Sequence, residues 1–154
     1  MDVQYIKPFV DATLHVLKTI AHTQVTSAKP YLKKDKIARG DVSGLIGLTG
    51  EVSGTISVSF SEKSILAIVT RMFGEEVTSL SDEIGDAVGE IANMISGQAR
   101  QVLENMGCPL QAAIPSVIMG KGHQISHITS HPVIAIPFET ENGGGFTIEV
   151  CFEH

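Results

Sequence analysis

Apolar positions near the N-terminus recur with the spacing of an amphipathic helix. Over residues 3–22 they repeat every three or four positions, which places them on one broad stripe of a helix. The stripe comprises Ile6, Phe9, Val10, Thr13, Leu14, Leu17, Ile20 and Ala21. Because proline lacks a backbone N–H and fits only the first turn, Pro8 predicts a helix that starts close to Tyr5.

The segment from residue 30 to residue 60 has the pattern of a sheet. In "LIGLTGEVSGTISVSF" two apolar runs are separated by glycines. Within the second run, Ile56, Val58 and Phe60 alternate with Ser57 and Ser59. This alternation predicts a strand that is buried on one side only.

The sheet pattern returns after residue 110. The segment "AAIPSVIMG" predicts a strand that carries a proline, and Val133–Thr140 followed by an alternating run from Phe146 to Phe152 predicts a hairpin. The loop of this hairpin is expected at Asn142-Gly143-Gly144-Gly145. Since proline cannot donate a ladder hydrogen bond, Pro115 and Pro137 predict sheet edges or bulges nearby.

Two further helices are expected between the sheet segments. Ser61 is suited to cap a short helix that Gly74 ends, and Ser81 opens a long helix that runs to about Met106. The whole pattern predicts an α/β (α+β) fold in a single domain over residues 1–154. A mostly antiparallel sheet would be covered on one face by two long helices.

The long helix carries a polar patch opposite its apolar stripe. With Ile84 at 0° and about 100° per residue, Val88, Ile91, Ile95, Val102 and Met106 fall within about 40° of it and are expected to be buried. The polar trio Asp86, Glu90 and Asn93 falls between about 180° and 240° instead. Spacing of i, i+4 and i+7 brings these three side chains within reach of one object.

A solvated helix face is the ordinary interpretation of such a patch. Glycine argues against it, since each interior glycine costs a helix about 1 kcal/mol relative to alanine. Gly97 lies one turn beyond the patch and Gly89 borders it, while Met94 stands where a lysine could pair with Glu90. Side chains are therefore missing where another surface could approach. Alternatively, Gly85 allows another helix of the same domain to pack closely.

The motif Asp86-x3-Glu90-x2-Asn93, on a long helix that follows a sheet segment, resembles that of the CheC/CheX/FliY family of bacterial chemotaxis phosphatases. Members of the CheC type carry the motif on both long helices. Here the equivalent part of the first helix, "DATLHVLK", has no Glu or Asn at the required places. A single motif on a chain of this length resembles the CheX members.

The resemblance implies a CheC-like fold and the dephosphorylation of a CheY-like response regulator that is phosphorylated on aspartate. It implies that Asn93 orients the attacking water and that Glu90 pairs with the regulator's lysine. Asp86, Gly89 and Gly97 are then expected to contact the regulator. The regulator would supply Mg²⁺, this chain would hold no cofactor or metal, and two chains would form a homodimer through the sheet.

A non-catalytic module that binds response regulators, like the flagellar switch proteins, is the alternative. Such a scaffold could keep Glu90 for docking and would have no need of Asn93. The presence of Asn93 favours catalysis.

Composition fits a soluble globular protein, with 43% hydrophobic and 18% charged residues among 154. A formal net charge of −6 gives no electrostatic footprint for nucleic acid. No apolar run approaches the ~18 residues that span a bilayer, no basic amphipathic segment suggests a membrane surface, and the N-terminus lacks a signal-peptide pattern. We therefore expect a cytoplasmic location.

Two cysteines and three histidines could form a disulfide or bind metal, but neither role is expected for them. Cys108 and Cys151 form no CxxC pair and are expected to be free, packed thiols. His123, His127 and His131 recur every four residues, but the glycines around residue 121 disfavour a helix there. We therefore expect loop histidines rather than a metal site.

Overall fold

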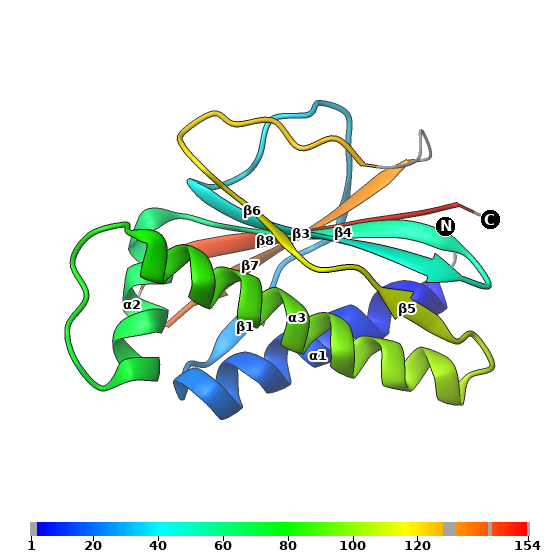
Figure 1. Ribbon diagram of the computed structural model, residues 1–154, viewed down its shortest axis with the longest axis horizontal. Coiled ribbons are helices and arrows are strands. Elements are labelled where there is room, and N and C mark those ends of the chain that lie inside the picture. Colours follow the sequence, from blue (N-terminus) through cyan, green and yellow to red (C-terminus); the bar gives the residue numbers. More distant parts are fainter. Residues whose placement is uncertain (1–2, 128–131, 142, 154) are drawn as a thin grey trace.

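The computed structural model describes residues 3–127, 132–141 and 143–153. Within them, one sheet of eight strands is accompanied by three helices (Figure 1). The elements in chain order are α1 (Val3–Ala21), β1 (Val25–Ser27), β2 (Tyr31–Lys33), β3 (Val42–Gly50), β4 (Ser53–Phe60), α2 (Glu62–Phe73), α3 (Asp82–Asn105), β5 (Leu110–Ala112), β6 (Ser116–Met119), β7 (Val133–Thr140) and β8 (Gly145–Glu153). The long helices α1 and α3 lie side by side on one face of the sheet, as the sequence predicts.

All strand pairs in the sheet are antiparallel, in the order β1-β7-β8-β4-β3-β5. Strand β2 shares the outer edge of β7 with β1, and β6 shares the outer edge of β3 with β5. The single strand expected around Pro115 is therefore two strands joined by a link at residues 113–115. Pro137 lies inside β7 but faces the gap between β1 and β2, where its carbonyl accepts a hydrogen bond from the Ala28 N–H at 2.8 Å.

The helix-facing side of the sheet is apolar and fully buried. Its central strands contribute Ile56, Val58, Phe60, Phe146, Ile148, Val150 and Phe152. The ring of Phe152 lies 5.8 Å from that of Tyr5 and 6.0 Å from that of Phe9, which ties α1 to β8. The helix α1 begins at Val3, two residues before the expected start near Tyr5, so Pro8 lies inside the helix and the expectation that it occupies the first turn is wrong. Burial of Phe9 offsets the backbone hydrogen bond that Pro8 removes.

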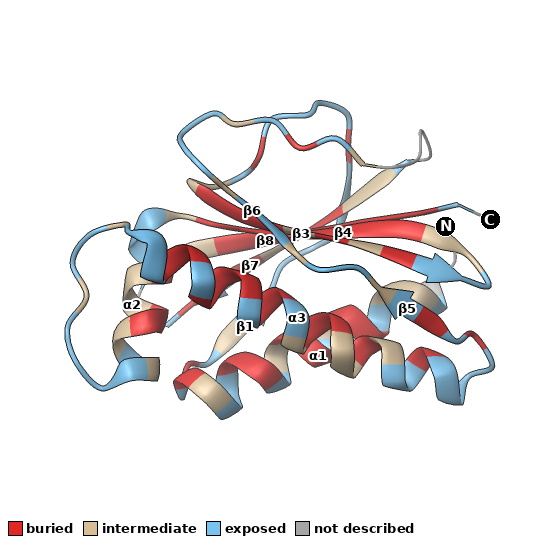
Figure 2. Cartoon of the chain, viewed as in Figure 1, coloured by how far each residue is buried: buried red, intermediate tan, exposed pale blue. Residues whose placement is uncertain are grey.

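The opposite side of the sheet is polar, yet it is also buried. Ser57 and Ser59 are fully buried, so the expectation of a strand buried on one side only is wrong. The segments 34–41 and 120–127 cross this side of the sheet, away from the helices, and exclude water from it (Figures 1 and 2). Local alternation could not reveal this cover, because it comes from distant parts of the chain.

Histidines fasten the segment 120–127 to the sheet. The side chain of His123 shares a hydrogen bond with the Ser43 hydroxyl at 2.6 Å, and that of His127 shares one with the Thr55 hydroxyl. These two residues are loop histidines with structural roles, as expected, while His131 lies outside the described residues. In the part of the chain that the structure describes, no group of three or more His, Cys, Asp or Glu side chains is arranged to hold a metal ion.

A buried charged group lies beneath the same segment. The Lys33 ammonium is 3.0 Å from one carboxylate oxygen of Glu149, and the ring of His127 is 3.1 Å from the other. The Lys33 and Glu149 side chains are each only 1% exposed. Removing either Lys33 or Glu149 would leave the other as an uncompensated buried charge. The group therefore holds β2, β8 and the segment 120–127 together.

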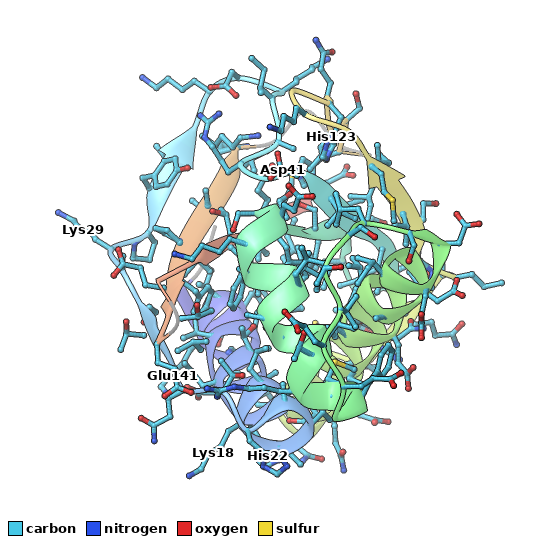
Figure 3. All side chains as sticks on the ribbon, turned by 90° about the vertical axis from the view of Figure 1, so that its left-hand side faces the viewer. Lys18, His22, Lys29, Asp41, His123 and Glu141 are labelled. Atoms are coloured by element: carbon cyan, nitrogen blue, oxygen red, sulfur yellow. The ribbon has the colours of Figure 1, made fainter. Side chains whose placement is uncertain are left out.

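The short helix α2 is fixed at both ends (Figure 3). At its start the Asp41 carboxylate accepts a hydrogen bond from the Glu62 N–H at 2.8 Å. At its end Arg71 donates to the His22 carbonyl at 2.7 Å and pairs with the Glu141 carboxylate, which lowers the pKa of that carboxyl. Figure 3 shows Asp41 above the upper end of α2, and His22 and Glu141 towards its lower end.

The expected ends of α2 and α3 are confirmed, and the two cysteines form no disulfide. Ser61 caps α2 by accepting the Ser64 N–H at 3.2 Å, and Gly74 ends it with φ 75°. The long helix stops before Gly107, which has φ 89°. Cys108 and Cys151 are both buried and form no disulfide, and burial raises the pKa of the Cys151 thiol. The Asn142 of the expected hairpin loop lies outside the described residues.

Candidate functional site

The long helix α3 packs against the sheet, against α1 and against strand β6, and its remaining side is exposed (Figure 2). Towards the sheet it packs against Gly44 of β3, where an added Cβ would lie 3.2 Å from the Ala92 Cβ and 3.3 Å from the Val88 Cγ1. The absent side chain lets the helix lie close to the strand. The helix is therefore held in one position relative to the sheet.

Strand β6 covers a second side of α3, next to two of its glycines. A Cβ at Gly85 would lie 2.9 Å from the Met119 Cε, and one at Gly89 would lie 3.5 Å from the Val117 Cγ2. The surface that approaches these glycines is thus a strand of the same chain. The alternative that another helix of the same domain packs against Gly85 is therefore wrong. Gly89 is buried, and its contact with a regulator stays a prediction.

Gly97 differs from the other two glycines of α3. The nearest heavy atom to an added Cβ there is the Arg100 Nη2, at 4.0 Å, so open space lies beside the helix at this point. No packing contact within the described residues accounts for a glycine at this position.

The C-terminal turns of α3 depart from the helical wheel. Val102 and Met106 are 45% and 49% exposed, so the expectation that they are buried is wrong. Ala99 and Leu103 are fully buried in their place. The chain turns back here, since the Cys108 N–H donates to the Leu103 carbonyl at 2.8 Å, and β5 then covers this side of the helix. The buried stripe therefore rotates towards β5.

The polar trio lies on the exposed side of α3, as the wheel predicts. Asp86, Glu90 and Asn93 are all exposed. At about 1.5 Å rise per residue they form a ridge about 10 Å long. Within the described residues, none of the three makes a hydrogen bond or an ion pair. Their polar atoms are therefore free to bind another molecule.

The ridge borders an open groove of about 660 Å³ between α3 and the link 113–115. Its lining comprises Gly85, Asp86, Gly89, Glu90, Asn93, Met94, Ile114, Pro115 and Val117. One wall is polar and carries two carboxylates, while the facing wall is apolar. An open groove of this kind fits the surface of a macromolecule better than a small ligand, which proteins usually enclose.

A model of the family described as chemotaxis phosphatase CheX matches residues 42–139, which include α3, β6 and every residue that lines the groove. The chain belongs to the CheX family. This membership confirms the resemblance to chemotaxis phosphatases and the CheC-like fold. It does not test the roles of individual residues in the ridge.

Individual CheX proteins are similar over nearly the whole chain. A crystal structure of a chemotaxis protein CheX from Desulfovibrio desulfuricans is 51% identical, has a TM-score of 0.89, and covers 97% of this chain and 99% of its own. The CheY-P phosphatase CheX of Thermotoga maritima is 25% identical over 126 residues, 81% of each chain. The CheX–CheY–BeF3–Mg²⁺ complex from Borrelia burgdorferi contains a chain that is 26% identical, with a TM-score of 0.83 and coverage of 97% and 98%.

The apolar wall of the groove was not foreseen from the sequence. Ile114 and Val117 belong to a stretch whose pattern predicts one continuous strand, and Pro115 alone indicates a break. Only the return of β5 and β6 along β3 brings this stretch beside α3.

No helix among the described residues is both long and apolar enough to cross a membrane.

Gly97→Ala tests whether this glycine serves the fold. With open space beside it, alanine should raise the free energy of unfolding by about 1 kcal/mol, the difference in helix propensity. Urea unfolding followed by circular dichroism measures the change. Gly85→Ala is the matched control on the same helix, and it should gain less because its Cβ meets Met119 at 2.9 Å. A loss of stability in Gly97→Ala would show that the glycine is required by the fold.

Proposed function

We propose that this protein is a cytoplasmic phosphatase that hydrolyses the aspartyl phosphate of a CheY-like response regulator. The observation that carries the proposal is the ridge: Asp86, Glu90 and Asn93 are exposed beside an open groove, and none has a partner within the described residues. Membership of the CheX family and the relative in complex with CheY support the choice of substrate.

In this proposal Asn93 orients the attacking water. Its amide has both donors and an acceptor, so it can hold a water in line with the scissile P–O bond. It is also uncharged, whereas a carboxylate at this position would repel the phosphoryl oxygens. An acyl phosphate is already labile to water, and a hundredfold acceleration needs only about 2.7 kcal/mol.

Glu90 precedes Asn93 by about 4.5 Å along the helix axis. We assign it to a charge-assisted hydrogen bond with a lysine of the regulator, which fixes the register of the docked helix. Asp86, one turn further back, makes a peripheral contact. Both carboxylates face away from the core, so the bond with the lysine forms only in the complex.

The Mg²⁺ is assigned to the regulator. The two carboxylates of the ridge do not belong to any larger group of potential metal ligands within the described residues. Phosphoryl transfer depends mainly on positioning and charge stabilisation, and a partner that brings its own metal leaves this chain the task of positioning.

Asn93→Ala should reduce the stimulated release of phosphate by about 100-fold, because a water that is no longer oriented loses about 2.7 kcal/mol of transition-state stabilisation. The measurement is phosphate release from phosphorylated CheY with the enzyme at substoichiometric concentration. Asn105→Ala, at the exposed end of the same helix, is the matched control and should keep full activity. Undiminished turnover in Asn93→Ala would remove the catalytic assignment.

Glu90→Ala should raise KM about tenfold, which corresponds to about 1.4 kcal/mol, and should also lower kcat. Glu90→Gln keeps the shape and removes the charge, so its KM should depend less on salt concentration than that of the wild type. Steady-state kinetics at two ionic strengths test both variants. Glu104→Ala, exposed further along α3, serves as the control. Equal salt dependence of wild type and Glu90→Gln would contradict the pairing with lysine.

The non-catalytic module is separated from the phosphatase by the same assay. A pure binder would leave the lifetime of the acyl phosphate unchanged or prolong it. A phosphatase shortens that lifetime at substoichiometric concentration.

We also propose that two chains form a homodimer through the sheet. One end of the sheet consists of the short strands β1 and β2, and no further strand among the described residues pairs with their outer edges. Exposed edges of this kind favour pairing with a second chain. Analytical ultracentrifugation should give twice the monomer mass of 16.4 kDa. A single species at the monomer mass over the micromolar range would contradict the dimer.

A further inference from the structure

Ile114 is the most exposed of the large apolar residues that the structure describes. Its exposed fraction is 90%, against 58% for the next, Leu32. Exposure of one apolar side chain is ordinary in a soluble protein and does not by itself mark a binding site. What distinguishes Ile114 is its position in the fold, on a rigid link across the groove from the polar ridge.

The link that presents Ile114 is firmly held. Immediately before it, the Ala113 N–H donates to the Gly47 carbonyl at 2.9 Å, and β5 and β6 both pair with β3 on either side of the link. Immediately after it, Pro115 restricts the backbone of the preceding residue to extended conformations. Ile114 is therefore displayed by a fixed backbone, and its exposure does not come from a loose loop.

Ile114 faces the polar ridge across the groove. With Pro115 and Val117 it forms the wall opposite Glu90 and Asn93. The apolar surface continues to Met119, which lines an adjoining groove of about 540 Å³. A partner protein whose pocket receives the Glu90 and Asn93 side chains must therefore also lie over Ile114.

The charges of the groove narrow the choice of occupant. Both charged side chains of its lining, Asp86 and Glu90, are acidic, and Asp82 continues the acidic edge into the adjoining groove. A complementary partner presents a cation beside an apolar patch. The regulator of the proposed function brings a lysine and a metal ion at its phosphorylated aspartate, whereas a second copy of this chain would bring the same acidic edge.

We propose that Ile114, supported by Val117, is the apolar anchor through which the phosphorylated response regulator docks, and that it sets affinity without taking part in hydrolysis. The inference rests on the proposed function. In many interfaces a few anchor residues in well-packed pockets, surrounded by contacts that exclude water, carry most of the binding energy. The anchor lies across the groove from Asn93, so it can bind the regulator while the water is positioned by other atoms.

The test is steady-state dephosphorylation of CheY charged by a small phosphodonor. Ile114→Ser should raise KM about tenfold, equivalent to about 1.4 kcal/mol, with kcat changed less than twofold. Ile114→Leu should restore KM to near the wild-type value. Ile37→Ser is the matched control, since Ile37 is 48% exposed on the opposite side of the sheet, and it should change neither constant. Because Ile114 is so exposed, its variants should melt at the wild-type temperature.

A second measurement separates the anchor at Ile114 from the hydrolytic role of Asn93. It is the calorimetric binding of CheY in its BeF3–Mg²⁺ form to the variants Asn93→Ala and Asn93→Ala/Ile114→Ser. The anchor predicts about tenfold weaker binding of the double variant, even if hydrolysis is assigned wrongly. Full turnover in Asn93→Ala would overturn the proposed mechanism alone. An unchanged KM in Ile114→Ser, a loss confined to kcat, or a change of oligomeric mass with unchanged KM would overturn the anchor.

Discussion

The close seating of α3 between the sheet and strand β6 is the constraint on which the rest of the structure depends. It is possible because side chains are missing at the two tightest contact points: Gly44 on the strand and Gly85 on the helix. A helix packed against the sheet, α1 and β6 cannot rotate without breaking one of its contacts. Its exposed side is thereby fixed in space, and the spacing of Asp86, Glu90 and Asn93 along it becomes a rigid feature of the surface.

Elements governed by local chemistry could be predicted from the sequence, and features made by distant segments could not. The period of 3.6 residues separated Asp86 from Ile84, and the cap at Ser61 set the start of α2, because both depend only on neighbours in the chain. Ser57 carries no local sign that the segment 120–127 covers it. Val102 fits the apolar stripe but is exposed, because the buried side turns towards β5. Likewise the groove has two walls, and only the polar wall lies within one element.

The form of the site fits the chemistry proposed for it. An enzyme that acts on a small molecule usually surrounds it, whereas here the reacting phosphate would sit in a partner's pocket and the helix must enter. A protruding ridge on a well-packed helix serves that geometry, since the rate depends on where the Asn93 amide holds the water. No side chain with a shifted pKa is needed, because the acyl phosphate already provides a good leaving group.

Three local features of this surface are unfavourable for the isolated chain, and all lie on or beside the groove. Gly97 forgoes about 1 kcal/mol of helix propensity beside open space. Asp86 and Glu90 are like charges at i and i+4, which repel by about 0.2–0.5 kcal/mol. Ile114 keeps 90% of its surface in water. At the caps of α2 and along the apolar face of the sheet, by contrast, local preference and packing agree. Departures that gather on one surface are best explained by what binds there, since the fold gains nothing from them.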